Sequence, residues 1–71
     1  MTNKFALCVD NTNYKASLIQ RKLYEVIPDE KANQDGLIRV IDESGEDYLY
    51  DSRRFVYIEL STQVERVLTA A

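Results

Sequence analysis

Short apolar runs alternate with polar clusters along the first part of the chain. FALCVDN, residues 5–11, is rich in residues that favour strands, and the polar cluster DNTN, which begins at Asp10, is typical of a turn. Residues 14–27 fit helical spacing in part, whereas their last five residues, LYEVI, favour a strand. Because the residue before a proline is pushed toward extended geometry, Pro28 favours a strand that ends at Ile27.

Three further apolar runs follow a polar connection. PDEKANQDG begins with acids and ends at Gly36, which predicts one helical turn with this glycine as its stop. LIRVI, YLY and FVYIEL predict strands over residues 37–41, 48–50 and 55–60, and DSRR predicts a short turn before the last strand.

The end of the chain changes to a helical period. Its apolar residues recur at the spacing of one helix face: Leu60, Val64, Val67 and Leu68. Thr62 with Glu65 three residues later has the form of a capping box, so we predict a short helix over about residues 62–69. We expect the apolar stripe to cover one open end of the strands rather than to bind a separate partner.

Short strands joined by turns predict a mainly β fold. We expect a small five-stranded antiparallel barrel over about residues 4–60 with a short C-terminal helix, in a single domain of residues 1–71. In the first strand, either Leu7 and Val9 or Ala6 and Cys8 face the core. The other predicted core residues are Leu18, Tyr24, Val26, Ile38, Val40, Leu49, Phe55 and Ile58.

The stretch VIDESGEDYLY, residues 40–50, carries four acids around Ser44-Gly45. Glycine at this point predicts a β-hairpin. A two-residue loop would set Val40 opposite Leu49, and a three-residue loop with a bulge would set it opposite Tyr48. Adjacent acids on a strand point to opposite faces, which disfavours a cation site. We expect a solvated tip that tolerates neutralisation of Asp42, Glu43, Glu46 and Asp47.

Composition narrows the classes of function. The chain has nine basic and 12 acidic residues, a net charge of −3, one cysteine and no histidine. We therefore expect no enzyme activity, no cofactor and no metal, and nucleic acid as an unlikely partner. The single cysteine fits a cytoplasmic location, and no apolar run reaches the roughly 20 residues of a membrane span. We expect no membrane partner.

The strand pattern resembles that of SH3-like barrels. ALCVDN, from Ala6, is similar to their Ala-Leu-Tyr-Asp-Tyr motif, and LIRVIDESGEDYLYDSRRF is similar to two strands, a distal hairpin and a 3₁₀ connection. More closely, CVDN, SL, KLYEVI, GLIRVIDESGEDYLY and RF resemble a set of small uncharacterised bacterial and phage proteins with this barrel. The chain has no tryptophan, and its only proline is Pro28, so proline-rich peptide recognition of the usual SH3 kind is not expected.

The candidate binding residues are aromatic or arginine side chains expected at the surface: Tyr14, Tyr50, Arg54 and Tyr57. Such residues are enriched at interfaces. We therefore predict a non-enzymatic interaction module that binds a protein partner or itself, including as a homodimer, through a Tyr/Arg surface. The alternative is a nucleic-acid-binding accessory protein that stacks bases on its tyrosines.

Overall fold

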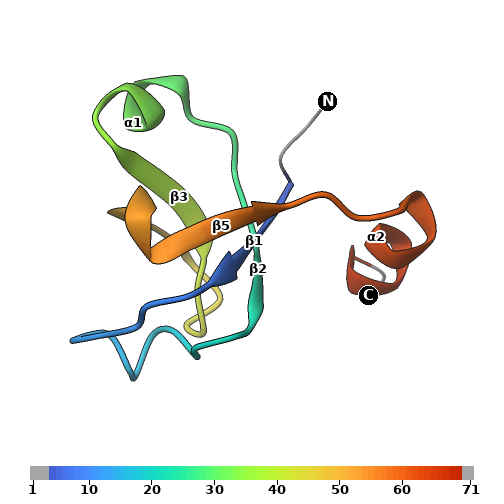
Figure 1. Cartoon of the computed structure of the whole chain (residues 1–71), viewed down its shortest axis with the longest axis horizontal. Helices are drawn as coiled ribbons and strands as arrows, with labels where there is room; N and C mark the ends of the chain where they lie inside the picture. Colours follow the sequence, from blue (N-terminus) through green and yellow to red (C-terminus); the bar gives the residue numbers. More distant parts are fainter. Residues whose placement is uncertain (1–3, 70–71) are drawn as a thin grey trace.

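The computed structural model describes residues 4–69, so residues 1–3 and 70–71 of the predicted domain lie outside the described part. Its elements, in chain order, are β1 (Phe5–Cys8), β2 (Leu23–Glu25), α1 (Glu30–Gln34), β3 (Leu37–Ile41), β4 (Asp47–Asp51), the 3₁₀ turn η1 (Ser52–Arg54), β5 (Phe55–Ile58) and α2 (Thr62–Thr69) (Figure 1). The prediction of a small mainly β fold is confirmed. All five strands overlap the runs in which strands were expected.

The strands form two antiparallel sheets. β1 lies between β2 and β5 in one sheet, and β3 pairs with β4 in the other. An isolated bridge between Val26 and Val40 connects the two sheets. Within residues 4–69 the strands are not closed into a barrel, so the structure supports the two-sheet arrangement rather than the closed form.

Residues 14–22 contain turns, and β2 covers the first three residues of the LYEVI run in which a strand was favoured. The backbone N–H groups of Ser17 and Leu18 both donate to the carbonyl of Tyr14, and Arg21 adopts a positive φ of 71°. The Leu18 side chain is fully buried, and the N–H of Ile19 donates to the Tyr24 hydroxyl at 2.7 Å. The Ser17 carbonyl accepts from the N–H of Glu43 at 2.9 Å, which fixes this turn against the β3–β4 hairpin and places Tyr14 beside it.

Most of the predicted core is buried. The prediction that Leu49 belongs to the core is wrong, since this residue is 43% exposed, and Ile58 is only half-buried. Ala6, Cys8 and Tyr50 belong to the core cluster, which settles the phase of the first strand. The predicted residues that are buried are Leu18, Tyr24, Val26, Ile38, Val40 and Phe55.

The hairpin register explains the error at Leu49. Val40 lies opposite Tyr48, and Ile38 lies opposite Tyr50, as the three-residue loop requires. Gly45 ends that loop with a positive φ of 84°, a conformation that glycine adopts without steric cost. Residues opposite each other share a face, so Tyr50 takes the core side of β4, and Leu49 points to the other side.

Helix α2 forms over the predicted residues, but its apolar stripe is not covered. Val64, Val67 and Leu68 are 43%, 73% and 46% exposed, so the expectation that the stripe covers the strands is wrong. Figure 1 shows α2 beyond the end of β5, apart from α1. The helix is capped by Ser61, whose hydroxyl accepts from the N–H of Val64 at 3.3 Å, rather than by Thr62. Neither helix in residues 4–69 is long and apolar enough to cross a membrane.

Candidate functional site

Three of the four predicted binding residues meet at one corner of the molecule. The rings of Tyr14 and Tyr50 are edge to face, with centroids 5.1 Å apart. The guanidinium carbon of Arg54 lies 4.7 Å from the centroid of the Tyr14 ring. Tyr50 is only 6% exposed, however, so the expectation that it is a surface aromatic is wrong.

Tyr57 lies further along β5, where it pairs with Ala6. Its side chain is 40% exposed. The ring contacts of the described residues join Tyr14, Tyr50 and Arg54 but do not include Tyr57. The predicted four-residue surface is therefore reduced to Tyr14 and Arg54, with Tyr50 beneath them.

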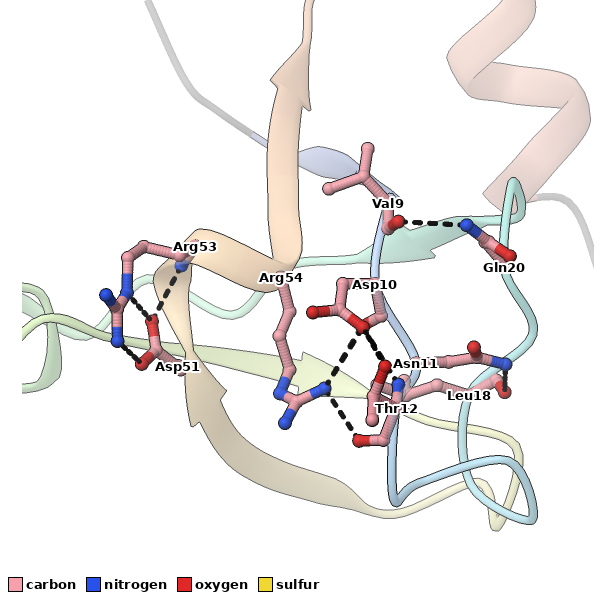
Figure 2. A network of polar contacts seen from close by, with 9 residues as sticks. All are labelled: Val9, Asp10, Asn11, Thr12, Leu18, Gln20, Asp51, Arg53 and Arg54. Atoms are coloured by element: carbon pink, nitrogen blue, oxygen red, sulfur yellow. Dashed lines mark hydrogen bonds and ion pairs between the residues drawn. The ribbon is translucent and has the colours of Figure 1, made fainter.

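Arg54 organises the loop that follows β1 (Figure 2). Its carbonyl accepts from the N–H groups of Val9 and Asp10, and its Nη1 donates to the carbonyl of Thr12 at 2.8 Å. The same nitrogen is 3.6 Å from a carboxylate oxygen of Asp10. Hydrogen bonds from Thr12 hold the pKa of the Asp10 carboxyl below its ordinary value. Arg54 thus holds residues 10–14 in the position that places Tyr14.

Replacing Arg54 with lysine should loosen this loop without unfolding the chain. Lysine keeps the charge but lacks the planar fork that stacks on a ring while donating to a carbonyl. We expect the protection of the Tyr14 amide against hydrogen exchange to fall about tenfold, because the two lost contacts are together worth on the order of 1 to 2 kcal/mol. The control is Arg53→Lys, at a side chain that is 89% exposed. Equal effects of the two changes would contradict this role for Arg54.

A recess of about 280 Å³ opens beside the Tyr14–Tyr50 contact. Two exposed tyrosines line it, Tyr14 at 42% and Tyr48 at 49% exposure, together with the buried Asp42 and Tyr50. We call this feature the tyrosine recess. Its full lining is Tyr14, Ser17, Asp42, Ser44, Tyr48, Leu49 and Tyr50.

Asp42 is a buried carboxylate, not a solvated tip residue, with 6% exposure. It accepts from the Tyr50 hydroxyl at 2.6 Å and from the N–H and hydroxyl of Ser44 at 2.8 and 2.5 Å. Burial acts to raise the pKa of Asp42, but these hydrogen bonds outweigh it and lower the pKa below its ordinary value. Burial, together with the hydrogen bond to Asp42, raises the pKa of Tyr50 to about 12. At neutral pH the carboxylate is therefore ionised and the phenol neutral.

Two other acids of the hairpin, Glu43 and Asp47, are exposed, as expected for a solvated tip, but both also form ion pairs. Glu43 accepts from Lys22 and from the Tyr24 hydroxyl, each at 2.6 Å, and both bonds lower its pKa. Asp47 accepts from Arg39 at 2.8 Å. Neutralising the four acids together would therefore remove specific contacts. One feature of the sequence does indicate the burial of Asp42, because this residue continues the alternate positions of the buried Ile38 and Val40.

Two further kinds of group bear on chemistry, namely clustered metal ligands and the cysteine thiol. Residues 4–69 hold no group of three metal-ligating side chains of the histidine, cysteine, aspartate and glutamate types. Cys8 is fully buried, and burial is the main cause that raises the pKa of its thiol. A protonated, inaccessible thiol is a poor nucleophile.

No family model, no curated protein and no solved structure matches the chain.

Proposed function

We propose that this chain is a small non-enzymatic interaction module that binds a protein partner, or a second copy of itself, around the tyrosine recess. The observation that carries the proposal is the recess itself, where two half-exposed tyrosines stand over a buried, hydrogen-bonded floor. Rigid aromatic side chains supply large contact areas at low cost in conformational entropy.

We further propose that the strands belong to a small SH3-like barrel. The strand order β2-β1-β5, the separate β3–β4 hairpin and the bridge from Val26 to Val40 support this assignment. The 3₁₀ turn η1 directly before β5 is a second point of similarity.

The charge distribution supports a protein partner over nucleic acid. Five of the nine basic side chains are in ion pairs with carboxylates: Lys4, Lys22, Arg39, Arg53 and Arg54. Phosphate binding would have to compete with these contacts, and the recess itself contains a buried carboxylate.

The test is a double variant, Tyr14→Ser with Tyr48→Ser. We expect it to lose partner binding or self-association while the chain stays folded, with a loss of stability of about 1 to 2 kcal/mol, because Tyr14 also contacts Tyr50 and Arg54. Sedimentation across a concentration series measures self-association, and capture from the native host's lysate by the immobilised chain measures partner binding. The matched control is Tyr57→Ser, at a tyrosine of similar exposure outside the recess.

Three results would redirect the proposal. Partner binding or self-association that survives in the double variant would contradict a role for the recess. Self-association that is lost only with Val67→Asp would place the contact on α2, where Val67 is 73% exposed. Binding of RNA or DNA that weakens steeply with salt would favour the nucleic-acid alternative.

A further inference from the structure

The four acids around the tip of the β3–β4 hairpin divide into two pairs. Glu43 is in an ion pair with Lys22, and Asp47 is in an ion pair with Arg39. Neither Asp42 nor Glu46 forms an ion pair with a described basic side chain. Of these two acids, Asp42 lines the tyrosine recess, and Glu46 contacts the hydroxyl of Tyr48, whose side chain also lines it.

Within residues 4–69 the hydrogen-bond donors to the Asp42 carboxylate are neutral groups. Oδ1 accepts from the N–H and the hydroxyl of Ser44, whereas Oδ2 accepts from the Tyr50 hydroxyl. A carboxylate has about four acceptor positions, so Oδ2 retains capacity for one more donor. Holding an ionised carboxylate away from water without a counterion is costly, and a cation that enters from outside would reduce that cost.

The Tyr48 ring lines the tyrosine recess, and no cation–π contact to this ring forms within the described residues. The cation–π contacts of residues 4–69 are Lys22 on Tyr24 and Arg54 on Tyr14. Tyr48 is 49% exposed, and its hydroxyl is 3.3 Å from a carboxylate oxygen of Glu46. The charge of Glu46 is the main cause that raises the pKa of the Tyr48 hydroxyl, so the potential at this ring is negative. An aromatic face in a negative potential favours a cation.

From this arrangement we propose that the tyrosine recess binds a lysine or arginine side chain presented by a partner protein. The inference rests on the proposed function and names the chemistry of the partner. The cationic head contacts the Tyr48 ring between Asp42 and Glu46, and its apolar stem lies along Leu49, which also lines the recess. A volume of about 280 Å³ is near the lower limit for ligand pockets, which suits one side chain. A phosphate group would face both carboxylates and is disfavoured.

The test is a titration of the ¹⁵N-labelled full chain with four short Gly/Ser peptides. Two carry a single arginine or lysine, and two carry the neutral counterparts citrulline or acetyl-lysine. We expect at least one cationic peptide to give saturable shifts at the amides of Ser44 and Tyr48, with its neutral counterpart binding about tenfold more weakly. Binding should also weaken as salt is added.

The variants use exposed residues, because Asp42 contributes to the fold. Tyr48→Ala and Glu46→Gln should each weaken the binding of the cationic peptide about three- to tenfold. The matched controls are Tyr57→Ala and Glu59→Gln, at an exposed tyrosine and an exposed acid outside the recess, which should leave binding unchanged. Equal weakening in the controls would show general attraction to an acidic protein and overturn the assignment.

The outcomes separate this inference from the proposed function. If no peptide binds, or if neutral and cationic peptides bind equally, the cationic ligand is excluded. Should the Tyr14/Tyr48 double variant still lose partner binding in that case, the recess remains an interaction surface for a partner of other chemistry.

Discussion

Replacing Val40 with alanine should lower the free energy of unfolding by about 1 to 3 kcal/mol. Val40 is fully buried, and it is the residue of β3 that forms the isolated bridge to Val26, directly after β2. The substitution removes two methyl groups where the sheets meet, and the surrounding strands can close the resulting cavity only in part. In a chain of 71 residues this loss is a large fraction of the total stability. Urea denaturation followed by circular dichroism measures the change.

The matched control is Val56→Ala, the same substitution at a side chain that is 50% exposed. It should change stability by less than about 0.5 kcal/mol. Equal losses at the two positions would mean that Val40 does not lie at the centre of the core.

Replacing Asp42 with asparagine should destabilise the chain by about 1 to 3 kcal/mol at neutral pH, because the amide cannot satisfy the Ser44 and Tyr50 donors as a carboxylate does. The effect should depend on pH. The folded-state pKa of Asp42 lies below its ordinary value, so the folded chain binds this proton less readily than the unfolded chain. The stabilisation is therefore complete above a pH of about 4 and is lost as the pH falls through the folded-state pKa.

Parallel denaturation of wild type and Asp42→Asn between pH 7 and pH 2 measures this difference. The difference in free energy of unfolding between the two proteins should become smaller as the pH falls, even though both lose stability through other acids. Asp51 is one of these, because its hydrogen bonds with Arg53 lower its pKa to about 2. Glu46→Gln is the control, at an exposed acid of the same hairpin, and a similar gap in that variant would assign the effect to net charge.

The strands and helices were predictable because local patterns decide them. Apolar runs located β3 and β4, Gly36 marked the end of α1, and helical spacing located α2. The arrangement of the elements was harder to predict from the sequence, because it depends on contacts between distant residues. Residues 14–22, where the sequence fits helical spacing in part, form turns that bury Leu18, and no local pattern predicts this. The exposed position of α2 has no local signal, because its stripe is the same whether or not something covers it.

The candidate site was predictable in part. Tyr14 and Arg54 were named from residue type, and they do lie together. Tyr50 was misassigned to the surface because the hairpin register was left open, and a shift of one residue reverses which side chains face the core. Asp42 and Tyr48 were missed as site residues. A carboxylate beside a turn glycine is usually exposed, and its partner Tyr50 lies eight residues away across the hairpin.

Because Cys8 is buried, the rate at which its thiol is modified reports how often the folded chain opens. The thiol lies in the core cluster on the inner face of the sheet, where β1 is the middle strand. A thiol-modifying reagent can reach the sulfur only when the core opens, so the labelling rate follows the frequency of opening rather than the chemistry of the sulfur. Since the sequence contains no other cysteine, each modified molecule records a single kind of event. The same seclusion protects the thiol from oxidation for as long as the sheet stays intact.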